Sequence, residues 1–79
     1  MKDEVFDKVK IVFRKVFRNT NLEINPENTA NDIPGWDSLT HMTLINELEI
    51  YFQTTFAFEE VRNLKNIGDI VELISKKIS

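Results

Sequence analysis

Apolar residues recur at helical spacing along the first 18 residues, and this pattern constrains the fold more than any other feature of the sequence. At 100° per residue they share one stripe roughly 140° wide, formed by Val5, Phe6, Val9, Val12, Phe13, Val16 and Phe17. Only Ile11 lies off this stripe. Acidic residues near the start and basic residues near the end suit the helix dipole. The pattern predicts an amphipathic helix over residues 3–18, whose apolar face must be covered by other helices.

Two further helices and a short one are predicted downstream. Residues 37–52 open with Asp37-Ser38, which suits an N-cap. The apolar residues of this second helix spread over most of its circumference, as in a central bundle helix or one partly exposed for a partner. Residues 58–64 leave room for a short helix, and the last helix begins at Asn66, with Asp69 placed as in a capping box. The predicted fold class is therefore all-α: a small four-helix bundle of three longer helices and one short one.

A long loop, residues 19–36, joins the first two helices. Turn-forming sequences mark it, namely Asn19-Thr20-Asn21, Asn25-Pro26, Asn31-Asp32 and Pro34-Gly35. Loops of this length without secondary structure are uncommon in small domains and usually have a function. Four apolar residues are spaced to pin the loop against the helices: Leu22, Ile24, Ile33 and Trp36. We expect an ordered loop.

Length and composition exclude several classes of protein. A chain of 79 residues predicts one domain, residues 1–79. It contains no cysteine, which excludes disulfides, thiolate zinc sites and a cysteine nucleophile, and its single histidine excludes a multi-histidine metal site. No apolar run is long enough to span a membrane, and residues 1–5 lack the apolar stretch of a signal peptide. These absences predict a cytoplasmic protein without a membrane span.

Charge is distributed unevenly along the chain. Residues 19–61 hold eight of the 13 acidic residues and no Lys or Arg, whereas both flanking segments are basic. Such a field attracts basic partners and repels nucleic acid, which argues against a nucleic-acid-binding bundle. The alternative is an acidic surface that serves only solubility.

The segment Gly35-Trp36-Asp37-Ser38-Leu39 places a serine hydroxyl in the first turn of the second helix. A phosphate ester on Ser38 would be favoured there by the helix dipole and free N–H groups, although Asp37 or Ser38 can also act simply as a cap. Nucleophilic catalysis by Ser38 would need a general base. The only imidazole, His41, has no evident carboxylate to orient it, so we expect a structural or partner-facing histidine and a protein that is not an enzyme.

The Asp37-Ser38-Leu39 triplet and the pattern that follows it resemble the acyl carrier protein family, which includes peptidyl and D-alanyl carrier proteins. The likeness covers nearly the whole chain and extends through Phe52-x3-Phe56-x2-Glu59-Glu60-Val61-x2-Leu64-x2-Ile67-Gly68-Asp69-Ile70. The resemblance implies a 4′-phosphopantetheine arm on Ser38 that carries cargo as a thioester. It also implies helices that enclose an apolar cleft for that cargo.

The same resemblance suggests roles for the residues around Ser38. Asp37 is expected to help a phosphopantetheinyl transferase position its metal-bound coenzyme A. Leu39 and Met42 are candidate partner contacts, with the core as their alternative location, and Phe58 is a candidate contact at the cleft edge with the same alternative. The acidic candidates for docking enzymes with basic surfaces are Glu47, which we expect to be exposed, and Glu49, Glu59 and Glu60.

One departure from the family bears on the pathway. Carriers of fatty-acid synthesis usually have acidic residues where this chain has Thr40 and Thr43, and Trp36 is more typical of carriers from specialised pathways. The leading hypothesis is a free-standing, monomeric carrier of acyl or related intermediates for fatty-acid, polyketide or specialised biosynthesis. The alternatives are a peptidyl or aminoacyl (D-alanyl-type) carrier, and a helical interaction module that carries no cargo.

Overall fold

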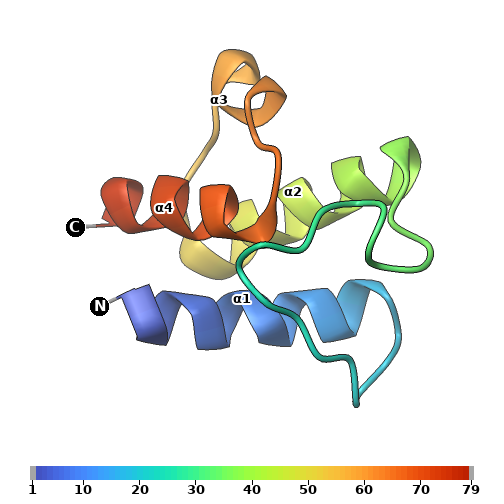
Figure 1. Ribbon diagram of the computed structural model, residues 1–79. Coiled ribbons are helices and arrows are strands. Elements are labelled where there is room, and N and C mark those ends of the chain that lie inside the picture. The colour runs from blue at the N-terminus through green and yellow to red at the C-terminus, as the bar shows by residue number, and fades with distance from the viewer. Residues whose placement is uncertain (1, 79) are drawn as a thin grey trace.

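Four helices in the predicted order make up the computed structural model, which describes residues 2–78. They are α1 (Lys2–Val16), α2 (Ser38–Phe52), α3 (Phe58–Arg62) and α4 (Ile67–Ile78), and the described range contains no strand. Figure 1 shows α4 running antiparallel to α1 and the short α3 set off on the side away from α1, and α1 contacts both α2 and α4. The predicted all-α bundle of three longer helices and one short helix is confirmed. None of the described helices is long and apolar enough to cross a membrane.

The core lies where α1 meets α2 and α4. Every buried residue in the described range is apolar. The three long helices supply most of them: Val5, Val9, Val12 and Phe13 from α1, Leu44, Ile45 and Leu48 from α2, and Ile67, Ile70, Val71 and Ile74 from α4. Burying one such side chain contributes about 1.5–3 kcal/mol to folding. The stripe predicted for α1 therefore faces both partner helices. Of the two interpretations of the broad apolar surface of α2, the partly exposed helix is the one observed, because Leu39, Met42, Ile50 and Tyr51 are exposed.

The first helix ends two residues before the predicted boundary. Arg18 adopts the left-handed conformation, with φ at 53°. The Asn19 N–H donates to the Arg14 carbonyl at 3.0 Å, and the Arg18 N–H donates to the Lys15 carbonyl at 3.3 Å. This is the Schellman pattern, which satisfies the last carbonyls and turns the chain away. The prediction that the helix extends to residue 18 is wrong. The spacing of apolar residues, on which it is based, gives no sign of a left-handed arginine.

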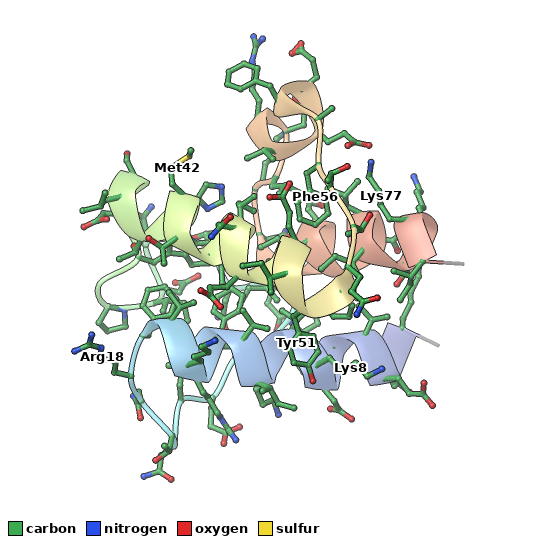
Figure 2. The ribbon with its side chains drawn as sticks, turned by 180° about the vertical axis from the view of Figure 1, so that it is seen from behind. Lys8, Arg18, Met42, Tyr51, Phe56 and Lys77 are labelled. Carbon is green, nitrogen blue, oxygen red and sulfur yellow. The ribbon has the colours of Figure 1, made fainter. Side chains whose placement is uncertain are left out.

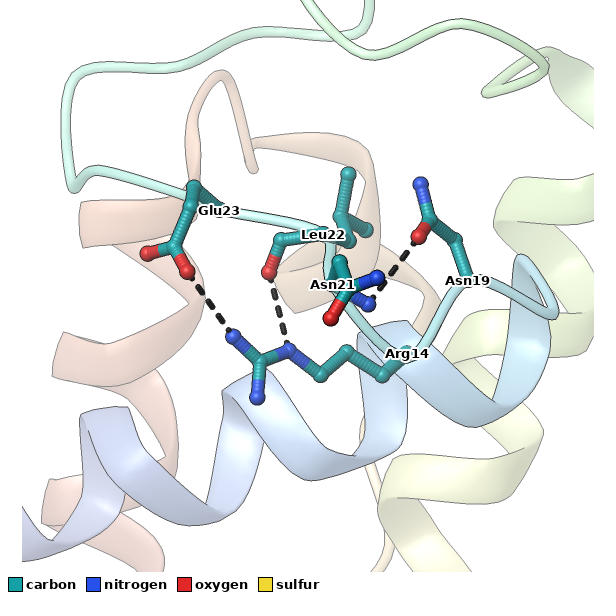
Figure 3. A network of polar contacts seen from close by, with 5 residues as sticks. All are labelled: Arg14, Asn19, Asn21, Leu22 and Glu23. Atoms are coloured by element: carbon teal, nitrogen blue, oxygen red, sulfur yellow. Dashed lines mark hydrogen bonds and ion pairs between the residues drawn. The ribbon is translucent and has the colours of Figure 1, made fainter.

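The loop between α1 and α2 is ordered, as predicted. Ile24, Ile33 and Trp36 are buried in the core and Leu22 packs against it. Figure 3 shows Arg14 holding the first part of this loop: its Nε donates to the Leu22 carbonyl at 2.9 Å, and one of its two terminal nitrogens, Nη2, donates to Glu23 Oε2 at 3.1 Å. The loop therefore adds buried surface to the bundle.

The start of α4 has the predicted cap. Asn66 Oδ1 accepts the Asp69 N–H at 2.8 Å. The Asp69 carboxylate reaches past Asn66 and accepts the Lys65 N–H at 2.9 Å. In a true capping box the Asp69 carboxylate would accept the N–H of the cap residue, Asn66, itself. Here it accepts the N–H of the preceding residue, Lys65, and still satisfies a free N–H group before the helix.

The same helix start also anchors the middle of the loop. The Gly68 N–H donates to the Pro26 carbonyl at 2.7 Å, and the Ile67 N–H donates to the Asn28 carbonyl at 3.0 Å. A Cβ on residue 68 would lie 3.1 Å from that Pro26 oxygen, so glycine allows this close approach. The loop is thus fixed to α1 at one end and to α4 near its middle.

Candidate functional site

A tight turn delivers the chain to the start of α2. Gly35 has φ at +87°, a backbone conformation that residues with a side chain rarely adopt. The Trp36 N–H donates to the Ile33 carbonyl at 3.2 Å. Proline at the second position and a positive-φ glycine at the third define a type II turn. This turn reverses the loop so that Asp37 lies directly before the first helical residue.

Asp37 is the N-cap and forms a capping box with Thr40. Asp37 Oδ1 accepts the Thr40 N–H at 2.9 Å, while Thr40 Oγ1 accepts the Asp37 N–H at 2.7 Å and donates to the Gly35 carbonyl at 2.7 Å. The hydrogen bond from the Thr40 N–H, followed by the contact of the Thr40 hydroxyl with Asp37 Oδ1 at 3.1 Å, holds the pKa of Asp37 below its usual value. The box fixes the backbone on both sides of residue 38 and keeps a carboxylate beside it.

Ser38 is the first residue of α2 and is exposed. Within the described part of the chain, its hydroxyl has no hydrogen-bond partner, so it is available for chemistry. The first turn of a helix favours negative charge through its free N–H groups and dipole. A phosphate ester on Ser38 would lie in that favourable field.

Trp36 and His41 form a pair next to Ser38. The Trp36 indole is buried and meets the Phe13 ring edge-on at 5.3 Å between centroids. Its Nε1–H donates to His41 Nδ1 at 3.0 Å, and the two rings stack at 5.9 Å. Burial lowers the pKa of His41. One imidazole nitrogen is thus committed to Trp36 and no described carboxylate orients the ring, which is unsuited to a hydrolytic dyad.

A hollow of about 530 Å³ opens beside Ser38. The N-terminal end of α2, the α1–α2 loop and the α3–α4 connection line it through Ala30, Trp36, Asp37, Ser38, His41, Met42, Leu64 and Lys65. A second hollow of about 360 Å³ lies between α2 and α3, lined by Met42, Ile45, Asn46, Glu49, Phe56, Phe58 and Val61. Met42 borders both hollows. Among the described residues, no group of His, Asp and Glu side chains is placed to hold a metal ion.

Similar proteins of known family allow the chain to be assigned. No family model matches the chain. The acyl carrier protein of Clostridium perfringens strain 13 is 33% identical over 72 residues, which cover 91% of this chain and 95% of that protein. The acyl carrier protein of Exiguobacterium sibiricum is 29% identical over 77 residues, 98% of both chains.

Solved structures agree. The holo acyl carrier protein from Geobacter metallireducens superposes with a TM-score of 0.88 and 42% identity, covering 94% of this chain and 85% of that one. A putative acyl carrier protein from Mycobacterium tuberculosis superposes with a TM-score of 0.82 and 26% identity, covering 91% and 96%. The chain belongs to the acyl carrier protein family.

Family membership confirms several of the predictions. Acyl carrier proteins carry 4′-phosphopantetheine, act as carriers rather than enzymes, and interact with a phosphopantetheinyl transferase and with biosynthetic enzymes. The arm of this acyl carrier protein needs an accessible hydroxyl, and Ser38 in its Asp-Ser-Leu triplet supplies one. The residues present therefore fit the cofactor of the family.

The three apolar contact candidates of this carrier lie at the surface. Leu39, Met42 and Phe58 are 77%, 66% and 78% exposed, so their alternative location in the core is excluded. Figure 2 shows Met42 pointing away from α1, on the side where α3 lies. Phe56, by contrast, packs against the core, as expected if only one of the two phenylalanines faces inward. Sequence reasoning missed the exposure of Ile50 and Tyr51 near the C-terminal end of α2.

Glu47 is not the exposed acid that the sequence predicts for α2. Its side chain is only 27% exposed and pairs with Lys15 of α1 at 3.0 Å. Glu49 Oε2, on the same helix, accepts the Phe56 N–H at 2.8 Å. Both carboxylates of α2 are therefore engaged in contacts that hold the fold together.

The two acids of α3 are paired as well. Glu59 lies 3.1 Å from Arg62, and Glu60 lies 2.7 Å from Lys77 of α4. The hydrogen bond from Lys77, followed by that from the Ala57 N–H, lowers the pKa of Glu60. Basic residues of α1, α3 and α4 thus pair with part of the acidic middle of the chain, namely Glu23, Glu47, Glu59 and Glu60.

Proposed function

We propose that this chain tethers acyl or related intermediates as thioesters on a 4′-phosphopantetheine arm attached to Ser38 and delivers them to partner enzymes. The observation that supports the attachment point is the exposed Ser38 hydroxyl at the first position of α2, framed by the Asp37–Thr40 capping box. Of the serines in the described range, the other is Ser75, which is half-buried on α4. An arm on Ser38 would extend from the protein without disturbing the core.

The chain's own residues account for how such an arm would be accepted. The capping box holds the backbone on both sides of Ser38, so a transferase meets the serine on a defined helix start. The Asp37 carboxylate is ionised at neutral pH, as an ordinary aspartate would be, and its lowered pKa extends the ionised range to more acidic pH. That negative charge beside Ser38 suits a role in positioning metal-bound coenzyme A on the transferase.

The hollow between α2 and α3 is the proposed shelter for an apolar cargo. Its lining is mostly apolar, and its volume of about 360 Å³ lies at the lower end of the roughly 300–1,000 Å³ of small-molecule sites. Phe56 closes it toward the core, and the exposed Phe58 stands at its rim. This arrangement supports an acyl cargo over a charged aminoacyl unit, whose amine would remain in water.

Partner enzymes are proposed to contact α2 mainly through apolar side chains. Leu39 and Met42 follow Ser38 by one and four residues and stand exposed on the same helix. Contacts between partner enzymes and four carboxylates remain a prediction, those of Glu47, Glu49, Glu59 and Glu60. Each carboxylate already has a partner within the protein and would have to bind the enzyme as well. A cytoplasmic location, a monomeric state and the absence of nucleic-acid binding also remain predictions from the sequence.

Intact mass spectrometry tests the attachment point. Incubated with coenzyme A, magnesium and a broad-specificity phosphopantetheinyl transferase, the protein should gain one phosphopantetheine, and Ser38→Ala should gain none. Ser75→Ala is the matched control and should be loaded like the unaltered protein. A gain that persists in Ser38→Ala would move the anchor elsewhere and overturn the assignment.

A further inference from the structure

The hollow beside Ser38 is built from segments far apart in the sequence. Ala30 comes from the α1–α2 loop, Met42 from α2, and Leu64 and Lys65 from the connection between α3 and α4. Its volume of about 530 Å³ lies within the roughly 300–1,000 Å³ of small-molecule sites. A group attached to Ser38 therefore begins at the wall of a hollow large enough to receive part of it.

His41 contributes a donor of fixed identity to this hollow. Because Trp36 Nε1–H donates to His41 Nδ1 at 3.0 Å, the neutral imidazole must hold its proton on Nε2. The stacked indole, itself buried against Phe13, restrains rotation of the imidazole ring. The second nitrogen has no partner among the described residues, so its N–H remains available to an acceptor in the hollow.

Lys65 contributes the only positive charge to the lining. Its backbone N–H is held by Asp69 at 2.9 Å, and within the described part of the chain no carboxylate pairs with its ammonium group. The one acid of the lining, Asp37, is engaged by Thr40 in the capping box. The hollow thus offers a cation and a hydrogen-bond donor next to apolar atoms of Ala30 and Leu64.

We propose that Trp36, His41 and Lys65 form a seat for the part of the phosphopantetheine arm nearest Ser38, which keeps the arm against the protein. The inference rests on the proposed attachment at Ser38. The arm begins with a phosphodiester anion, followed by a branched dimethyl unit and two amides. Lys65 suits the anion, His41 Nε2–H suits an oxygen acceptor, and the apolar lining suits the dimethyl unit.

Nuclear Overhauser effects in isotope-labelled holo protein test the seat, after intact mass has shown complete loading. Contacts are expected between the dimethyl protons of the arm and both the Trp36 indole and the Leu64 methyl groups. His41→Phe keeps an aromatic ring but removes both nitrogens, and should lose these contacts. His41→Gln supplies a new acceptor and donor, and should retain them. Thr43→Val, on the same helix but outside the lining, is the control and should behave as the unaltered protein.

A second pair of variants tests the charge. Lys65→Met keeps the aliphatic stem and should weaken the arm contacts, whereas Lys8→Met on α1 should leave them unchanged. Holo protein without contacts from the arm to Trp36 or Leu64 would overturn the seat while leaving attachment at Ser38 intact. Contacts that survive unchanged in both His41→Phe and Lys65→Met would overturn the assigned residues. Failure of loading would overturn the attachment and the seat together.

Discussion

Replacing Thr40 with valine removes one oxygen, leaves the shape of the side chain nearly unchanged, and so isolates the capping box that presents Ser38. The Thr40 hydroxyl makes two hydrogen bonds of 2.7 Å, one with the Asp37 N–H and one with the Gly35 carbonyl. A hydrogen bond contributes about 0.5–1.5 kcal/mol net, so the loss of two should cost roughly 1–3 kcal/mol. In a domain of this size that corresponds to a fall in Tm of roughly 4–24 °C.

Thermal unfolding followed by far-ultraviolet circular dichroism measures this loss. Thr43→Val is the matched control, because Thr43 is exposed and its hydroxyl makes only one long bond, 3.3 Å, to the Leu39 carbonyl of its own helix. That variant should change stability by less than about 0.5 kcal/mol. If Thr40→Val melted at the same temperature as Thr43→Val, the capping box would not be what defines the start of α2.

The same box makes a prediction about pH. The folded protein holds the pKa of Asp37 below its ordinary value, through the Thr40 N–H first and the Thr40 side chain next. The resulting stability is present above the unfolded pKa of about 3.9 and is lost as pH falls through the folded pKa. Thr40→Val should move the pKa of Asp37 back toward its ordinary value, as read from a carboxyl titration by NMR. An unchanged titration would show that the side chain of Thr40 contributes nothing to it.

Three further predictions concern the packing and the cargo. Glu47→Lys would place a second positive charge beside Lys15 and should lower the free energy of unfolding by about 1 kcal/mol, the repulsion of two like charges about 4 Å apart in water. Adding Lys15→Glu restores opposite charges and should restore stability. If stability did not recover, the ion pair would contribute nothing to the fold. Gly68→Ala should lower the Tm, because the new Cβ would press on the Pro26 carbonyl, and an unchanged Tm would show that the loop yields without cost. Acyl chains of increasing length on the arm should raise the Tm, as each buried methylene contributes about 0.8 kcal/mol, and no rise would show that the hollow between α2 and α3 takes no cargo.

Much of the fold follows from local signals in the sequence. The apolar stripe of α1, the N-cap at Asp37 and the cap at Asn66 are each written within a few neighbouring residues, and each appears in the structure. The position of Ser38 at the start of α2 follows from the same signals. Local patterns were sufficient there because the hydrogen bonds concerned span only three or four residues.

The features that the sequence did not predict depend on contacts between distant residues or on rare backbone conformations. Lys15 and Glu47 lie 32 positions apart, so their ion pair became visible only when α1 and α2 were placed together. The left-handed Arg18 that ends α1 has no sequence signature, because glycine is the usual residue there. The exposure of Ile50 and Tyr51 likewise depends on which faces of α2 the other helices cover.

Tandem mass spectrometry of the protein isolated from its own cells tests the central claim most directly. We predict a 4′-phosphopantetheine on the peptide that contains Ser38, with a thioester-bound acyl group on a fraction of the molecules. The mass of that group would identify the cargo. A native protein whose Ser38 is unmodified, or whose phosphopantetheine lies on another residue, would contradict the account.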